Sequence, residues 1–266
     1  MKILIVGGGN MGLTYARAFV RSQVTSRLDL RLLARSDARA ATLTAHELGG
    51  VYTDPAQCVP GADIVILAVK PQDSGALFGT LAPWLDARQV VISIMAGVPI
   101  STLRAALGVG KIIRAMPNLP AQIGMGMTAF TSTDDVTRAE LVQVQNLLST
   151  TGKTVYVEAE AAIDAATAIS GSGPAYVFYC MEALMSAATQ LGFSAAEAEL
   201  LVSQTFRGAV ELYAQAGHSC QEWIGRVASK GGTTEAALRA FAAADLRGAL
   251  IEGATAARDR AEELGR

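Results

Sequence analysis

The chain has 266 residues, of which 51% are hydrophobic and 17% charged, and its formal net charge is −2. Nucleic-acid binding needs a positively charged surface, so a chain without any Lys/Arg-rich run is not expected to bind nucleic acid. The three cysteines and two histidines lack metal-ligand spacing, which predicts buried, reduced thiols and no metal site. Neither a signal peptide nor a membrane span is recognisable, so a cytoplasmic protein that does not enter membranes is expected.

The first part of the chain alternates apolar, strand-like runs with helix-like segments. Strands are expected at residues 1–6, 28–33, 62–69, 90–94, 111–115, 127–131 and 154–158. Helices are expected at residues 12–20, 38–48, 76–85, 101–107 and 134–148. Because the strands are apolar on both faces and alternate with helices, the pattern predicts an α/β domain with a doubly wound parallel sheet.

The second part of the chain has helical periodicity and no convincing strand. The expected division is an α/β domain at 1–158 and an all-α domain at 159–266. From Ala161 to Phe193 the only charged residues are Asp164 and Glu182. A helix that is apolar on all sides is buried on all sides. In so small a domain a second copy of the chain is the simplest cover, so the helical domain is expected to form homo-oligomers.

A glycine motif follows the first predicted strand and opens the first helix. Gly7 permits a tight turn, Gly9 lets the backbone approach a pyrophosphate, and Gly12 lets the helix pack closely on the sheet. The alternative is a glycine turn that serves structure alone. The motif lies between a strand and a helix, and this position favours a Rossmann dinucleotide-binding site over a purely structural turn. The site would be formed by Gly7, Gly8, Gly9, Asn10, Met11 and Gly12.

The end of the second predicted strand indicates which dinucleotide binds. An NAD-binding domain usually has an acidic residue there, which holds the ribose 2′-hydroxyl. This chain has Arg35 and Ser36 instead, which can pair with and donate to a 2′-phosphate. The sequence therefore predicts NADPH, with NADH as the alternative; Arg35 could also be a solvated surface side chain.

Two further strand ends are candidates for the same cofactor. Ala68, Val69, Lys70 and Pro71 end one buried strand, and Ala96 and Gly97 follow the next. Ligands of open α/β sheets lie at the carboxyl ends of the strands, so both segments are expected to pass the ribose and nicotinamide. A strand-ending proline beside an exposed lysine is the alternative interpretation.

The helical part contains two glycine-rich interruptions. In SGSGPAY (170–176) a helix is expected to begin at Pro174, since proline suits the first helical turn. In ASKGGTTEAAL (228–238) Gly231 and Gly232 precede a helix that begins near Thr233. Free amides at a helix start bind carboxylates, so a substrate carboxylate is expected here, with a hydroxyl left for the reacting group. Capping of the helix by Thr233 or Thr234 is the simpler alternative.

Taken together, these motifs resemble the pyrroline-5-carboxylate reductase family along essentially the whole chain. The matching segments are GGGNMG (7–12), AVKP (68–71), ISIMAGV (92–98), MPNLPAQIGMGMT (116–128), SGSGPAY (170–176) and ASKGGTTEAAL (228–238). The resemblance implies an NAD(P)H-binding Rossmann domain, a helical dimerisation domain, active sites built across a dimer and often a decamer. It implies that the substrate carboxylate binds at Ser229, Gly231, Gly232, Thr233 and Thr234.

The resemblance also implies the reaction, which is hydride transfer from NADPH to the cyclic imine 1-pyrroline-5-carboxylate, the last step of proline biosynthesis. Thr234 is expected beside the ring nitrogen as the catalytic hydroxyl. The chain departs from the family pattern at four positions: Pro55 stands for a frequent Asn, Leu119 for Thr, Met125 for Glu and Lys230 for Pro. Lys230 leaves open a reductase of another cyclic imino acid.

Two other functions are weighed from the sequence. A β-hydroxyacid reductase would need a catalytic lysine after the first domain, and residues 160–206 contain none. A non-catalytic NADPH-binding sensor would have no need of the glycine–threonine loop at 231–234. The cyclic-imine reductase is therefore the favoured function.

Overall fold

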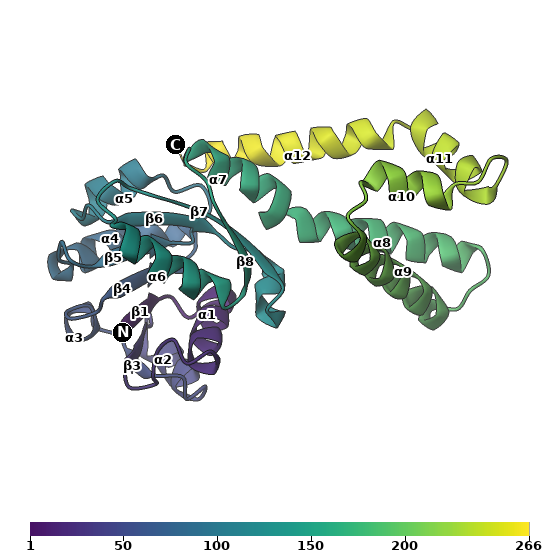
Figure 1. The fold of residues 1–266 in the computed structure, drawn as a ribbon. Coiled ribbons are helices and arrows are strands. Elements are labelled where there is room, and N and C mark those ends of the chain that lie inside the picture. Colours follow the sequence, from purple (N-terminus) through teal and green to yellow (C-terminus); the bar gives the residue numbers. More distant parts are fainter. Residues whose placement is uncertain (266) are drawn as a thin grey trace. The chain divides into compact units, whose positions relative to one another are not determined.

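A computed structural model describes residues 1–265, apart from the side chain of Ala216. The chain forms two compact units, which are Met1–Ser172 together with residues from Ala257 onward, and Gly173–Ala256 (Figure 1). The first unit extends past residue 158 because helix α7, Ala161–Ala166, packs on two strands of the sheet. The division into sequence domains at 1–158 and 159–266 stays a prediction beside this division into compact units.

The first unit is built on one eight-stranded sheet of order β3-β2-β1-β4-β5-β6-β7-β8. Its strands are β1 Ile3–Val6, β2 Leu30–Leu33, β3 Gly50–Tyr52, β4 Ile64–Leu67, β5 Val90–Ser93, β6 Ile112–Met116, β7 Gly126–Ser132 and β8 Gly152–Tyr156. All neighbours pair in parallel except β6 and β7, which are antiparallel. The fold class is confirmed, and the expectation of a wholly parallel sheet is wrong at this one junction. Residues 117–125 are too short for the crossover of roughly a dozen residues that parallel strands require.

The strands bury both faces, as their unbroken apolar runs predict. Ile3 and Ile5 of β1 belong to one core cluster, whereas Leu4 and Val6 belong to the other. The first cluster is covered by α1 (Asn10–Arg21), α2 (Asp37–Thr44) and α6 (Arg138–Ser149). The second is covered by α3 (Pro55–Cys58), α4 (Ser74–Leu81) and α5 (Ile100–Leu107). Helices on both faces make the sheet doubly wound.

The short edge strand β3 is absent from the sequence prediction. It has only three residues, each half-buried, and it begins at the second glycine of the pair Gly49-Gly50. Such a segment has neither alternation nor an apolar run from which a strand could be recognised. The preceding helix also ends earlier than expected, at Thr44 instead of residue 48.

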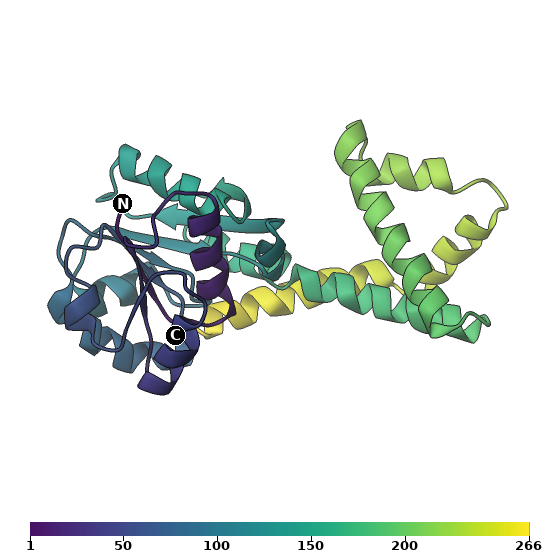
Figure 2. The same cartoon turned by 90° about the horizontal axis from the view of Figure 1, so that it is seen from below.

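The second unit consists of helices (Figures 1 and 2). They are α8 Gly173–Gln190, α9 Ala195–Ala216, α10 Cys220–Val227, α11 Thr233–Ala243 and most of α12, Leu246–Glu263. Helix α8 begins one residue before the expected Pro174. None of the described helices is both long and apolar enough to cross a membrane.

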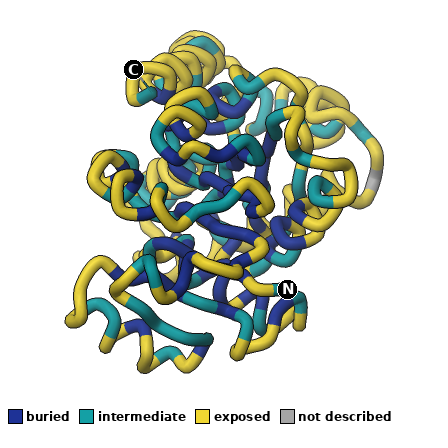
Figure 3. Tube along the Cα trace, turned by 90° about the vertical axis from the view of Figure 1, so that its left-hand side faces the viewer, coloured by how far each residue is buried: buried dark blue, intermediate teal, exposed yellow. Residues whose placement is uncertain are grey.

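Burial differs sharply along the chain. In Figure 3 the buried stretches of the tube, in dark blue, lie mainly in the sheet and the helices against it. Of the described hydrophobic side chains between 173 and 256, only Ala198 and Val202 are buried. Large apolar side chains there are open to solvent, with Tyr179 75% and Leu200 68% exposed.

Candidate active site

The strand order reverses between β1 and β4, and two of the predicted cofactor segments meet there. Gly7 follows β1 with φ +101°, and a Cβ on it would lie 2.8 Å from the carbonyl oxygen of Ala68 and 2.9 Å from Val69 Cγ1. A side chain is therefore excluded by the backbone conformation and by the neighbouring segment. Crevices at such reversal points are where open α/β sheets bind ligands.

The other glycines of the motif meet different surroundings. A Cβ on Gly12 would lie 2.1 Å from the Gly7 carbonyl oxygen, and one on Gly8 would overlap Leu43. A Cβ on Gly9, in contrast, would meet no described atom within 4 Å. Gly9 is the N-cap of α1, whose first turn has no acidic residue and no capping side chain among the described residues. The space at Gly9 and the uncapped amides beside it fit a bound pyrophosphate.

The segment after β2 has one cation that sequence reasoning missed. Arg35 is exposed and forms no ion pair with any side chain of residues 1–265. The Ser36 hydroxyl oxygen caps α2 by accepting from the Arg39 amide at 3.3 Å. The Arg39 guanidinium donates to the Gly8 carbonyl oxygen, which joins α2 to the glycine turn. Arg39 lies in the first turn of α2, shortly after the Arg35-Ser36 pair, and this closeness in sequence is the signal by which it could have been found.

The two later strand ends continue the same edge of the sheet. The Ala68 amide donates to Val6 O at 2.8 Å, and the Ile94 amide donates to Leu67 O at 3.1 Å. A hollow of about 530 Å³ joins the two segments and is lined by Pro71, Ala96 and Gly97, among others. The structure therefore brings the predicted cofactor residues of four strand ends together along one edge.

A buried ion cluster supports the segment that leads into SGSGPAY. The Arg114 guanidinium on β6, 3% exposed, donates to Glu160 at 3.0 Å and to Asp164 of α7. Glu160 also accepts from the Ile100 amide at 2.7 Å, at the start of α5. A buried charge that loses its partner is strongly destabilising, so these groups hold β6, α5 and α7 in one arrangement.

Helix α7 continues into a π-helical turn, Thr167–Gly171, before α8 starts. The Asn118 side chain donates to Ser170 O at 3.0 Å and accepts from the Met127 amide at 2.8 Å. This side chain ties the turn to the segment between β6 and β7. Single π-helical turns are frequent at functional sites, because they redirect backbone groups that a regular helix would pair.

The predicted substrate residues form one turn at the start of α11. The Gly232 amide donates to Ser229 O at 3.0 Å, and the Gly231 amide donates to the carboxylate of Glu235. Gly232 is the N-cap, so capping by Thr233 or Thr234 is wrong, and no described side chain caps this helix. The reason is that α11 begins at Thr233, so both threonines lie inside the helix and neither occupies the N-cap position.

Three other helices show what is missing at α11. Helices α6, α9 and α10 each begin with a complete capping box, in which a Ser or Thr hydroxyl and a Glu three residues later satisfy each other's backbone amides. In α11 the glutamate is present and the hydroxyl is replaced by Gly232. Its first-turn amides therefore lack the oxygen that the other three helices supply, and an external carboxylate can supply it.

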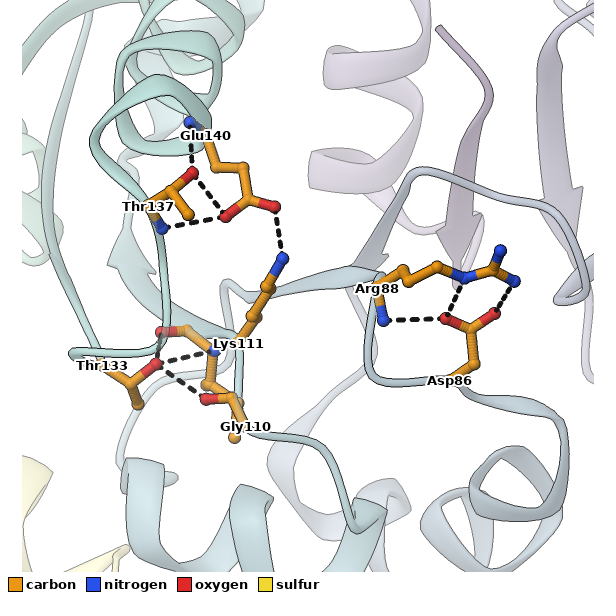
Figure 4. A network of polar contacts seen from close by, with 8 residues as sticks. Asp86, Arg88, Gly110, Lys111, Thr133, Thr137 and Glu140 are labelled. Atoms are coloured by element: carbon orange, nitrogen blue, oxygen red, sulfur yellow. Dashed lines mark hydrogen bonds and ion pairs between the residues drawn. The ribbon is translucent and has the colours of Figure 1, made fainter.

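The opposite edge of the sheet carries charged groups that are already paired. Lys111 donates to Glu140 at 2.6 Å, and Arg88 contacts Asp86 at 3.0 Å (Figure 4). Burial alone would raise the pKa of Glu140, but the hydrogen bonds from Lys111 and Thr137 outweigh it and hold the pKa below its usual range. A second hollow of about 520 Å³ lies here, lined partly by these residues. It lies at the amino ends of the strands, away from the predicted cofactor segments.

Comparisons with known proteins agree with this architecture. Residues 160–264 match the model for pyrroline-5-carboxylate reductase dimerisation, and residues 2–97 match the model described as NADP oxidoreductase coenzyme F420-dependent. Pyrroline-5-carboxylate reductase of Corynebacterium melassecola is 36% identical over 99% of this chain and 98% of its own length. The Pseudomonas aeruginosa enzyme is 35% identical, with 99% and 96% covered.

The chain belongs to the pyrroline-5-carboxylate reductase family. Solved structures of the family agree with this. That of Coxiella burnetii has a TM-score of 0.91 and 32% identity, with 100% of this chain and 98% of the other covered. That of Plasmodium falciparum, determined with NADP bound, has a TM-score of 0.90 and 26% identity at the same coverage. The sequence prediction of the family is thereby confirmed.

Proposed function

We propose that the chain reduces 1-pyrroline-5-carboxylate to L-proline with NADPH. The observation that carries this proposal is the similarity to pyrroline-5-carboxylate reductases over nearly the whole length of both chains. Both glycine-rich segments fall inside that similarity. The uncapped start of α11 supports it independently, because an anionic substrate needs such amides.

NADPH would supply the hydride, and residues of the first unit would hold it. Gly7, Gly8, Gly9, Asn10, Met11 and Gly12 would receive the pyrophosphate, and the space at Gly9 supports this assignment. Arg35 and Ser36 would pair with the 2′-phosphate, and Arg39 adds a cation to them. Ala68, Val69, Lys70, Pro71, Ala96 and Gly97 would contact the rest of the dinucleotide. NADH is the weaker alternative, because it lacks the phosphate that these cations would bind.

The substrate carboxylate would bind at the start of α11. Of the proposed residues Ser229, Gly231, Gly232, Thr233 and Thr234, the two glycines have amides that are already used within the turn. Their role is therefore to shape the turn. The amides of Thr233 and Thr234 are in the first helical turn, where no intrahelical acceptor exists, and they would bind the carboxylate.

Thr234 would orient the ring nitrogen. A protonated imine accepts hydride far better than a neutral one, so a hydrogen-bond partner at nitrogen assists the reaction. A threonine hydroxyl is too weak an acid to supply the proton itself, so substrate protonation or solvent supplies it while Thr234 holds the geometry. Most of the acceleration would come from fixing the two reactants against each other.

A second substrate class follows from Lys230. This exposed lysine adds a cation next to the proposed carboxylate turn, where the family usually has proline. A six-membered cyclic imino acid carries the same carboxylate and imine, so it remains the competing substrate.

We also propose that the chain forms a homodimer at least, with a decamer as the larger alternative, in the cytoplasm. The match to a dimerisation model and the open apolar side chains of α8 to α12 support self-association. Cys58, Cys180 and Cys220 are free thiols, which suits a reducing compartment, but the expectation that all three are buried is wrong, because Cys220 is exposed on the open helical unit. Sequence domains at 1–158 and 159–266 are retained, supported by the model match that begins at residue 160.

The test is NADPH oxidation by the purified protein with 1-pyrroline-5-carboxylate and, in parallel, with its six-membered homologue. We expect the five-membered ring to have the higher kcat/KM. A higher kcat/KM for the six-membered ring would show that the six-membered cyclic imino acid is the preferred substrate, contrary to the proposal. NADPH binding without turnover of either compound would refute a reductase and favour a sensor.

A further inference from the structure

The C-terminal end of the chain packs against a proposed cofactor segment. Helix α12 ends at Glu263, and from Ala257 onward it belongs to the first compact unit. Ala261 is only 3% exposed, although the surrounding turns of α12 are largely open. Its carbonyl oxygen and Leu264 both face Gly97, which follows β5.

A side chain at Gly97 is disfavoured both by its backbone conformation and by this contact. Its φ is +74°, and a Cβ on it would lie 2.7 Å from Leu264 Cβ and 3.0 Å from Ala261 O. The contact is tight in both directions, because a Cβ on Gly265 would lie 2.3 Å from Gly97 O. The glycine that the sequence assigns to the cofactor therefore also accommodates the C-terminal end of the chain.

The same residues close one side of the hollow at the cofactor edge. Leu264 and Gly265 line it together with Pro71, Ala96 and Gly97, which belong to the two proposed cofactor segments. Leu264 and Gly265 thus line the same hollow as these segments, and they also pack against Gly97.

We propose that residues Ala261–Gly265 are a positioning segment of the cofactor site. They keep Gly97 in its left-handed conformation and close the hollow beside it, so NADPH affinity depends on the end of the chain. The inference rests on the proposed cofactor site. If the competent conformation of the turn falls to a tenth or a fifth of the population, the Kd for NADPH rises about fivefold to tenfold.

The first test removes the contact. A chain that stops after Glu263 is compared with Leu264→Glu, which keeps the length but places a carboxylate beside the hollow, and with the conservative Leu264→Met. The control is Val142→Glu on α6, since Val142 is 52% exposed and Leu264 48%. NADPH affinity is measured by direct titration and thermal stability alongside it.

We expect the shortened chain and Leu264→Glu to bind NADPH about fivefold to tenfold more weakly, while Leu264→Met and Val142→Glu bind as the wild type does. The KM for the imine should change less than twofold. A lower melting temperature with unchanged NADPH affinity would mean a purely structural role and would overturn the inference. Failure of the wild type itself to bind NADPH would instead refute the proposed function.

The second test asks whether Gly97 and the C-terminal residues act together. Gly97→Ala is made in the full-length and the shortened chain. We expect it to weaken NADPH binding by a larger factor in the full-length chain, because only there does the new methyl group meet Leu264. Equal factors in both chains would show that Leu264 and the residues after it do not act on Gly97, which contradicts the inference.

Discussion

The two units of this chain bury apolar surface in different ways. In the first, every strand from β1 to β6 except the edge strand β3 contributes fully buried residues to clusters on the two faces of the sheet. In the second, α8 and α9 pack on each other but leave side chains such as Phe178 and Val210, 57% and 63% exposed, open to water. Many large apolar side chains left open to water are typical of an interface.

The two units also differ in which proposed ligand they bind. The proposed cofactor residues belong to a unit that makes its own core, and the proposed substrate residues belong to a unit that does not. Cofactor recognition should therefore depend on local groups, whereas turnover should depend on association of the helical units as well. The following variants separate these two dependences.

The largest effect is expected from charges on the apolar surface of the second unit. Phe178→Glu combined with Val210→Glu should prevent self-association, because a carboxylate buried in an apolar contact is costly. We expect a monomer by light scattering and activity reduced about a hundredfold or more, since loss of a central contact can remove most of the binding energy. Val142→Glu on α6 is the control. An unchanged molecular mass with full activity would contradict the claim that the apolar side chains of the second unit form an interface on which turnover depends.

The next effect is confined to the second unit and concerns chemistry. Thr234→Ala should lower kcat about a hundredfold, within the range usual for a lost proton-transfer or orienting group, and leave the KM for NADPH unchanged. Thr205→Ala is the control, because the Thr205 hydroxyl bonds within α9 to Leu201 O at 2.7 Å. Full turnover of Thr234→Ala in the imine assay would remove this residue from the mechanism.

A smaller effect is confined to the first unit. Arg35→Ala should weaken NADPH binding about tenfold through loss of a charge-assisted contact, and leave NADH binding nearly unchanged. Arg27→Ala is the control, since Arg27 is also an exposed arginine and lies before the same strand β2. An equal loss of affinity for both dinucleotides would rule out the 2′-phosphate contact.

The smallest effect concerns the stability of the first unit at acidic pH. The pKa of Glu140 is held below its ordinary value of 4.5, so the Lys111 pair stabilises the fold above that pH, and the stabilisation is lost as pH falls through the lowered pKa. Lys111→Met should cost roughly 1 kcal/mol at pH 7. The difference from wild type, measured by urea unfolding, should shrink below pH 4.5. A difference independent of pH would exclude the ion pair as its cause.

Much of the first unit follows from local sequence alone. Runs such as ILIV at 3–6 and IVIL at 64–67 are apolar on both faces, and only a strand covered by helices on both sides satisfies that pattern. The glycine motif at 7–12 is equally local, because the spacing of its glycines is enough to predict a tight turn between a strand and a helix. The family and the fold class could therefore be predicted, whereas the cofactor segments stay a prediction.

The remaining features depend on residues that are distant in sequence. Nothing near Arg114 indicates that Glu160 and Asp164 neutralise it, and nothing near Gly97 indicates that Leu264 covers it. The reversed direction of β7 has a local cause in its short connection, but hydrophobic periodicity carries no strand direction. Sequence pattern determines which faces are apolar and which turns need glycine. Only the tertiary structure decides which partners those faces and turns meet, because burial and ion pairing are set by contacts between segments far apart along the chain.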